Sequence, residues 1–270
     1  MFIIGEKLNS TRKKVREMIE NRDGTMIQDL ALNQMESGAD MLDVNSSAAS
    51  GNKEENMAWL VKTVQEVVDG PLCIDSPNPE EIEIGLQAHD WAKGKALINS
   101  ITGEKEKIDR LLPVIKKTRC AVIALAMDER GIPDNSKIRV EIVDRLIKLL
   151  RNAGVPFQDI FIDPLVVPIG TNDRNGLITM ETIRRVREGY PEVRIVTGLS
   201  NISFGLPERK LINQVFMMLT MGCGMDAAII DPTDKRIMAM IKTASVLLGE
   251  DHFCMEYIKA FREGRLSCEK

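Results

Sequence analysis

Short polar side chains that could bind or activate a small molecule recur directly after apolar runs in this 270-residue chain. All of them are carboxylates or carboxamides. In chain order they are Asn9, Asp43, Asn45, Asp75, Asn99, Asp128, Asp163, Asn201 and Asp231. A carboxylate accepts hydrogen bonds, whereas a carboxamide both donates and accepts them. Such a mixture suits a flat heterocycle with several N–H and C=O groups, for example one with a 2-amino-pyrimidinone edge.

A metal site explains these residues less well. The chain has only two histidines, His89 and His252, and neither follows a run that predicts a strand. Asp43, Asp75 and Asp163 could together hold Mg²⁺, but neutral amides are interleaved with them. No Ser/His or Cys/His pair stands out as a nucleophile with its base. We therefore expect a hydrogen-bonding site without an intrinsic metal.

Several of the same side chains also have a purely structural interpretation. Asp and Asn are common after strands because they cap helices and stabilise turns. We interpret Asp128 and Asp231 in this way, and Ser76 and Ser100 can likewise be turn or cap residues. A ring of six or more polar groups around one opening needs partners or solvent, however, and this favours a binding site.

Regular elements must bring these residues together. Eight short apolar runs predict strands, at Phe2–Ile4, Met41–Val44, Leu72–Ile74, Ala96–Ile98, Ala121–Ala124, Ile160–Ile162, Arg194–Thr197 and Ala227–Ile230. Amphipathic spacing predicts helices near residues 25–37, 54–69, 79–88, 104–117, 137–152, 178–188, 209–221 and 234–248. Strict alternation of the two is typical of βα units with a parallel sheet.

A closed (β/α)8 TIM barrel is favoured over an open doubly wound sheet. The first strand is not followed by a Gly-x-Gly-x-x-Gly turn, and no phosphate-binding glycine loop occurs. Residues just after the strands of such a barrel converge on its active-site face. Gly38, Gly154 and Gly222 are expected to end helices, and Pro79 to begin one.

The bulk properties fit one domain, residues 1–270, with an extra C-terminal helix at about 252–263. Its 44% hydrophobic content and net charge of −4 exclude a disordered chain and a nucleic-acid-binding surface. The five cysteines have no paired spacing, and no apolar run approaches the roughly 20 residues of a membrane span. We therefore expect a cytoplasmic protein with reduced thiols. The cysteines are Cys73, Cys120, Cys223, Cys254 and Cys268.

The combined order of these motifs resembles the pterin-binding methyltransferase family. The matching segments are Gly5-Glu6-x-x-Asn9, Asp43-x-Asn45, Ile74-Asp75-Ser76, Ile98-Asn99-Ser100, Ile162-Asp163-Pro164 and Gly198-Leu199-Ser200-Asn201. Within the family, the chain is most similar to stand-alone methyltetrahydrofolate:corrinoid protein methyltransferases and to methylcorrinoid:tetrahydrofolate methyltransferases. It is also similar to the folate domain of cobalamin-dependent methionine synthase. The likeness extends from Phe2 to about Phe261.

The resemblance implies a role for each matching residue. Asp75, Asn99 and Asp163 would hydrogen-bond the pterin ring, and Asn201 would lie near nitrogen-5, which carries the transferred methyl. The resemblance further implies contacts from Gly198, Ser200, Arg209, Asn9, Asp43 and Asn45. The first two of these would shape the pterin floor, and Arg209 would approach the aminobenzoate-glutamate tail. The last three would form the rim that faces the corrinoid.

The methyl transfer itself calls for a hydrogen-bond network rather than a strong acid. A methyl group leaves a tertiary amine poorly unless the nitrogen gains a proton or a hydrogen bond as the bond breaks. A neutral, mobile Asn201, supported by Asp75 and water, could stabilise the protonated amine without trapping it. One departure is Phe204, which stands where relatives carry a polar Gln and so puts a polar contact from this loop in doubt.

The partners expected from the resemblance are folate, as substrate, and a corrinoid protein. The chain lacks an Asp-x-His-x-x-Gly segment for holding cobalamin, since the spacing at residues 251–254 is wrong. The corrinoid should therefore arrive on a separate protein. The resemblance also predicts a homodimer, whereas Met217, Met218 and Met221 are expected to pack in the core.

Three alternatives stay open at the level of sequence. A dihydropteroate synthase-like enzyme shares the barrel, but Asp231-Pro232-Thr233 replaces the Ser-x-Arg-like element expected after its last strand. A non-catalytic folate-binding or corrinoid-docking subunit is disfavoured by Asn201. A metal-assisted barrel hydrolase would lose its activity to a chelator. The direction of methyl transfer is not encoded in the residues.

Overall fold

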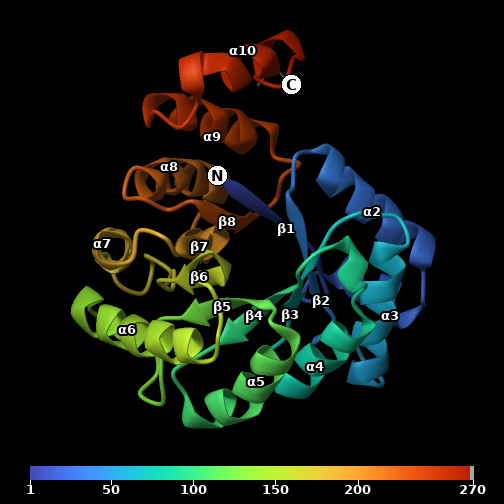
Figure 1. Cartoon of the computed structure of the whole chain (residues 1–270). Coiled ribbons are helices and arrows are strands. Elements are labelled where there is room, and N and C mark those ends of the chain that lie inside the picture. The colour runs from blue at the N-terminus through green and yellow to red at the C-terminus, as the bar shows by residue number, and fades with distance from the viewer. Residues whose placement is uncertain (268–270) are drawn as a thin grey trace.

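Eight parallel strands close into a barrel in a computed structural model that describes residues 1–267 (Figure 1). The strands are β1 Phe2–Asn9, β2 Met41–Asn45, β3 Leu72–Asp75, β4 Leu97–Ile101, β5 Ala121–Leu125, β6 Ile160–Asp163, β7 Arg194–Gly198 and β8 Ala227–Ile230. Each strand pairs with the next, and β1 pairs with β8 from Phe2 against Ala227 onward. The predicted TIM barrel is confirmed. The end of the expected 1–270 domain, with Cys268, lies outside the described residues.

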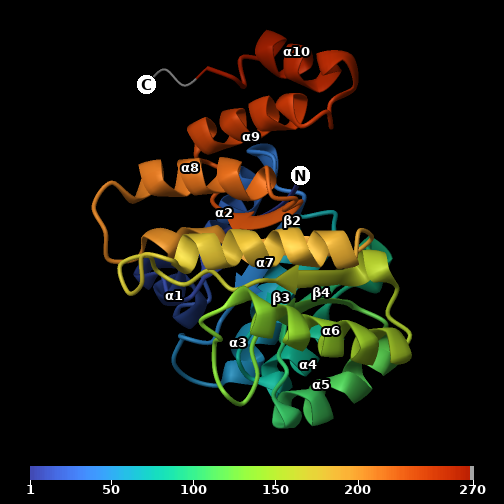
Figure 2. The ribbon, with the colours of Figure 1, turned by 90° about the vertical axis from the view of Figure 1, so that its left-hand side faces the viewer.

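Helices surround the barrel and follow the predicted positions closely (Figure 2). They are α1 Lys13–Glu20, α2 Gly24–Glu36, α3 Lys53–Gln65, α4 Pro79–Ala88, α5 Lys105–Thr118, α6 Ser136–Asn152, α7 Asn175–Gly189, α8 Arg209–Met221, α9 Lys235–Leu247 and α10 Met255–Arg262. Four 3₁₀ turns add η1 Trp91–Lys93, η2 Phe157–Asp159, η3 Leu199–Ser203 and η4 His252–Cys254. Helix α10 lies outside the ring, against α9 (Figures 1 and 2). None of the described helices is long and apolar enough to cross a membrane.

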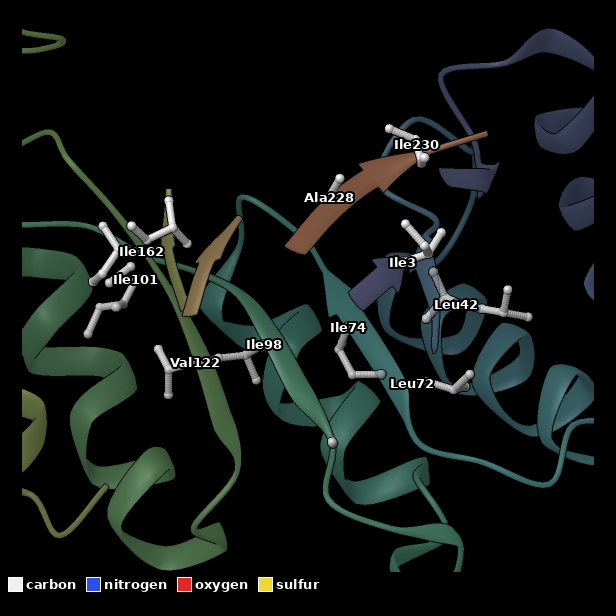
Figure 3. Packing of buried hydrophobic residues seen from close by; sticks show 14 of the residues in the cluster. Ile3, Leu42, Leu72, Ile74, Ile98, Ile101, Val122, Ile162, Ala228 and Ile230 are labelled. Atoms are coloured by element: carbon white, nitrogen blue, oxygen red, sulfur yellow. The ribbon is translucent and has the colours of Figure 1, made fainter. Parts of the chain in front are cut away.

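Strand alternation separates two apolar regions. Side chains that point outward from the strands pack under the helices, as Figure 3 shows for Leu42, Ile74 and Val122. Because successive side chains of a strand point to opposite faces, the residues directly before and after these point into the barrel. The inward set fills the barrel with a small separate cluster: Ile4, Met41, Cys73, Leu97, Ala121, Ile123, Phe161, Val196 and Ala227. The barrel is therefore plugged below the strand ends.

Local signals explain most helix ends. Pro79 begins α4, and Asn78 caps it by accepting a hydrogen bond from Glu80 N–H. Gly38 and Gly154 end helices with φ of 101° and 89°, conformations that glycine adopts without strain. Gly222 also ends its helix, but its φ of −63° is right-handed, so the left-handed turn falls on Gly224 instead.

Candidate active site

Two adjoining cavities open at the carboxyl ends of the strands. The first, which we call the ring cavity, has a volume of about 410 Å³. Among its lining residues are Asn9, Asp43, Asp75, Asn99, Asp163, Gly198, Ser200 and Asn201. The second, the adjoining cavity, has a volume of about 500 Å³ and is lined by Arg209, Lys210, Asn213 and Asp231 among others. Glu6, Thr11, Arg12 and Ser200 line both. The structure thus brings most residues of the predicted site together.

The polar ring stands directly on the apolar plug. Along β3, Cys73 belongs to the plug, and Asp75, two residues later, faces the ring cavity. The same step leads from Phe161 to Asp163 on β6. Because alternate residues of a strand share one face, the plug and the ring are successive layers of the same barrel interior.

Hydrogen bonds join the ring residues of β2, β3 and β4. Asn45 Nδ2 donates to Asp75 Oδ2 at 2.8 Å, and Asn99 Nδ2 donates to Asp43 Oδ1 at 3.4 Å. Asn45 Oδ1 in turn accepts from the backbone N–H of Ser47 at 3.0 Å. These bonds fix the amide orientation of Asn45, so that Asp75 receives a donor.

Two of the three expected rim residues lie elsewhere. Asp43 is 2% exposed and Asn45 is 7% exposed, so neither forms a rim. Asp43 lines the ring cavity and accepts from Asn99, whereas Asn45 is not among the lining residues of either cavity and donates to Asp75. Asn9 is half-buried at the end of β1, where its Oδ1 accepts from Thr11.

The ring holds carboxylates that resist ionisation. Burial, reinforced by the charge of Asp75, raises the pKa of Asp43 well above its ordinary value. Burial also raises the pKa of Asp75 to about 6, although hydrogen bonds from Asn45 and Asp43 oppose the rise. Burial likewise raises the pKa of Asp163 to about 6, opposed by the backbone N–H groups of Leu165 and Gly198. Carboxyl groups in this state are typical of binding and catalytic sites.

Arg139 supports Asp163 from behind, a role that the sequence analysis missed. Its guanidinium, on α6, is only 1% exposed and donates to the carbonyl oxygens of Pro133, Pro164 and Leu165 at 2.6–2.9 Å. This arrangement holds the turn that follows β6, in which Leu165 has a φ of 66°. The available signal was an arginine on the apolar side of an amphipathic helix.

Asn201 differs from the other amides of the ring. It lies on η3, is exposed, and its side-chain amide has no hydrogen-bond partner among residues 1–267. A Cβ added to Gly198 would lie 3.4 Å from Asn201 Nδ2, so glycine leaves the amide room. The ring cavity therefore contains one amide that is free to bind a ligand.

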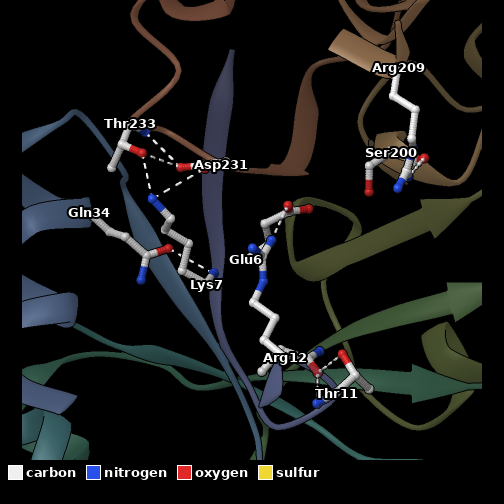
Figure 4. Close-up of polar contacts among 10 residues, drawn as sticks. Glu6, Lys7, Thr11, Arg12, Gln34, Ser200, Arg209, Asp231 and Thr233 are labelled. Atoms are coloured by element: carbon white, nitrogen blue, oxygen red, sulfur yellow. Dashed lines mark hydrogen bonds and ion pairs between the residues drawn. The ribbon is translucent and has the colours of Figure 1, made fainter. Parts of the chain in front are cut away.

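Arg209 lines the adjoining cavity and contacts Ser200, which lines both cavities (Figure 4). Arg209 donates to the carbonyl oxygen of Ser200 at 2.8 Å and to Ser203 Oγ at 3.1 Å. Its guanidinium carbon also lies 5.8 Å from the ring centre of Phe204, whose side chain is 67% exposed. A cation and an exposed aromatic ring thus lie side by side at the mouth.

Other charges near the mouth are paired. Arg12 contacts Glu6 at 2.7 Å, and Lys7 contacts Asp231 at 3.2 Å (Figure 4). Asp231 also accepts from Thr233, so it ties β1 to the turn after β8.

Asp128 lies outside both cavities and forms ion pairs with Arg130 and Arg145. The hydrogen bond from the Arg130 side chain lowers the pKa of Asp128 to about 2.

Ser76 also has a structural contact, since its hydroxyl donates to Glu81 at 2.8 Å. Across the described residues, no three His, Cys, Asp or Glu side chains are grouped so as to hold a metal ion.

Known proteins resemble this chain over most of its length. It is 40% identical over 268 residues to a methylcorrinoid:tetrahydrofolate methyltransferase of Eubacterium limosum, covering 98% of both chains. It is 30% identical to methionine synthase of Mycobacterium tuberculosis over 85% of this chain but 20% of that protein. Dihydropteroate synthase of Xanthomonas albilineans shares the fold, with a TM-score of 0.63 and 18% identity over 93% of this chain and 92% of that one. The family described as pterin binding enzyme matches residues 5–231. This match, together with the ring of polar residues, shows that the chain belongs to the pterin-binding enzyme family.

Proposed function

We propose that this protein is a methyltransferase that moves a methyl group between nitrogen-5 of tetrahydrofolate and the cobalt of a corrinoid. The likeness to the methylcorrinoid:tetrahydrofolate methyltransferase carries this proposal, because it spans 98% of both chains. The ring cavity supports it with carboxylates and amides suited to a pterin edge. The corrinoid supplies the cobalt that gives or receives the methyl, and a separate partner protein carries it.

Asp75, Asn99 and Asp163 are assigned to the pterin ring. They come from neighbouring or nearby strands and line one cavity of about 410 Å³. Asp75 and Asp163 accept hydrogen bonds from N–H groups of the heterocycle, and Asn99 can donate as well as accept. Gly198 and Ser200 complete the wall, and Arg209 is assigned to the negatively charged glutamate tail.

Asn201 is assigned to nitrogen-5. Its amide is free of other bonds in the described structure, so it can turn to the nitrogen as charge develops there. A neutral amide stabilises the protonated amine more than the neutral one, and this difference lowers the barrier. Asp75, on the opposite side of the ring cavity, supports this hydrogen-bond network. The proposed mechanism uses no metal held by this chain, so a chelator is expected to leave turnover unchanged.

Methyl transfer can be tested with the pure protein. Methyltetrahydrofolate with cob(I)alamin, and methylcobalamin with tetrahydrofolate, should each change the cobalt absorption spectrum when the protein is added. The faster of the two reactions indicates the favoured direction. An unchanged spectrum in both mixtures would refute the proposed function, and a protein that binds folate without any transfer would be a non-catalytic subunit.

Asn201→Ala tests the proposed mechanism. We expect kcat to fall about 100-fold, because a hydrogen-bonding group that acts mainly in the transition state is removed. The folate Kd should change by less than about 3-fold. Asn33→Ala, on the exposed face of α2, is the matched control and should keep both constants. Equal losses in kcat and in folate affinity would contradict the assignment.

The homodimer is proposed to form through α8. From Leu211 to Met221 this helix has no charged residue, and its exposed side chains are Leu211, Val215 and Leu219, 49–56% exposed. A solvated helix carries charges on its outer face, whereas an apolar stripe at this spacing suits packing against a second copy. Val215→Glu should convert a dimer into a monomer in sedimentation velocity, and Thr243→Glu on α9 should not. A wild-type protein that sediments as a monomer would contradict the proposal.

The protein is also proposed to be cytoplasmic. The four described cysteines are free thiols, which supports this location.

A further inference from the structure

The floor of the ring cavity contains a carboxyl pair that the proposed chemistry does not use. Asp43 on β2 and Asp75 on β3 line the same cavity, and Asp43 pairs in register with Cys73, one inward position below Asp75, so the two carboxyl groups are close enough to interact. Two ionised carboxylates have only acceptor oxygens, so a hydrogen bond between them requires a proton on one of the two. Like charges this close also cannot both remain ionised in a buried site. The pair therefore holds one proton and one negative charge.

The surroundings decide which carboxyl carries the proton. Asp43 is 2% exposed, whereas Asp75 is half-buried and faces the ring cavity. Asp75 also receives the amide of Asn45 at 2.8 Å, while the amide of Asn99 approaches Asp43 at a longer 3.4 Å. The more deeply buried group with the weaker donor is the one that stays neutral. Burial and the charge of Asp75 both raise the pKa of Asp43.

Among residues 1–267, no positively charged side chain faces Asp43. The groups that face Asp43 are the Cys73 thiol and the Asp75 carboxylate from β3 and the Asn99 amide from β4. Glu6 from β1 lines the same cavity, but it is paired with Arg12. Burial and the two nearby carboxylates raise the pKa of Cys73, so it stays a thiol and can donate. Asp43 thus has acceptor oxygens for Asn99 and Cys73 and one O–H for Asp75.

We propose that Asp43 is a positioning residue: it stays a neutral acid, and its O–H donates a hydrogen bond to Asp75 from below. This inference rests on the proposed function, since it assigns Asp75 to the pterin. With Asp43 beneath it and Asn45 beside it, Asp75 keeps one negative charge and directs its remaining lone pairs into the ring cavity. An ionised Asp43 would instead repel Asp75 and disturb this geometry.

An asparagine has the same shape and the same donor and acceptor pattern as a neutral aspartic acid. In Asp43→Asn, the carbonyl can accept from Asn99 while the amide donates to Asp75, and no proton can be lost. We expect this variant to bind tetrahydrofolate within about 3-fold of the wild type at pH 7, measured by calorimetry without a corrinoid. Asp43→Leu keeps the branched shape, with two bulkier methyl groups and no donor, and its folate Kd should rise at least about 10-fold. Asp69→Asn, an exposed acid on the surface, is the control for a neutral substitution.

A second measurement does not depend on ligand binding or on the folding of the leucine variant. At pH 7 the infrared spectrum of the wild type should contain the C=O band of a protonated carboxyl, which Asp43→Asn should lose and Asp69→Asn should keep. Loss of folate binding in Asp43→Asn as severe as in Asp43→Leu, or an infrared band that survives in Asp43→Asn, would overturn the inference. A wild type that fails to bind folate would instead refute the proposed function.

Discussion

Asp163 combines a cost in stability with a proposed role in binding. Its pKa is about 6 in the folded protein because it is buried, against about 4 in an unfolded chain. Between these two values the folded state binds more protons than the unfolded state. The free energy of unfolding therefore falls as pH rises from about 4 to 6, and the loss is complete above pH 6.

Asp163→Asn should remove this loss. The free energy of unfolding is expected to rise by about 1–3 kcal/mol at pH 7 and to change little at pH 4, because the amide cannot ionise. Urea denaturation at the two pH values measures the difference. Folate affinity should fall in the same variant, since a charged acceptor is lost. An equal change in stability at both pH values would show that ionisation of Asp163 is not the cause.

The depth of each polar residue in the barrel could not be predicted from the sequence. The Asp and Asn residues near the ends of apolar runs predicted a polar ring at the strand ends, and the structure brings most of those residues to one cavity. That pattern does not reveal the depth of Asp43, which lies inside the run Met41–Val44, or of Asn45, which directly follows it. Their depth depends on the register of β2 against β3, in which Asp43 pairs with Cys73, one inward position below Asp75. Register between strands distant in sequence is set by barrel closure, which single-sequence patterns do not record.

At the scale of elements, the turn after β6 depends on one buried cation. Arg139→Lys should lower the free energy of unfolding by about 3 kcal/mol, because an ammonium cannot reproduce the fork that serves three carbonyl oxygens. The turn also positions Asp163, so folate affinity should fall. Arg185→Lys, in an exposed pair with Glu181 on α7, is the matched control and should cost less than about 0.5 kcal/mol. Urea denaturation and calorimetry measure both; similar losses in the two variants would contradict the special role of Arg139.

The elements themselves were largely predictable. All eight strands and nine of the described α-helices overlap predicted positions, because apolar runs and amphipathic spacing record burial directly. Helix α1 was missed. Five of its eight residues are charged, and only Val15 and Ile19 are buried, so its apolar face is too narrow to predict a helix. Strand β1 also extends five residues further than predicted, through Glu6 and Lys7, and Lys7 pairs with the distant Asp231.

At the scale of the molecule, barrel closure is complete before the C-terminal helix. Strand β1 pairs with β8 over four positions from Phe2 against Ala227, and both cavities are lined by residues up to Ile237. Helix α10 contributes one buried residue, Ala260, and packs outside α9 (Figure 2). The site and the barrel therefore have their structural basis within residues 1–250.

A variant that ends at Glu250 is expected to keep the barrel and its site. Its folate Kd and methyl-transfer kcat should stay within about 2-fold of the full chain, since no residue of either cavity is removed. Its Tm should fall by about 2–4 °C, because the loss of α10 exposes apolar surface of α9 and costs about 1 kcal/mol. Replacing Ala260 by Asp in the full chain should reproduce that fall by loosening α10 alone. If the shortened protein unfolds or loses folate binding, α10 is part of the barrel's stability rather than an addition to it.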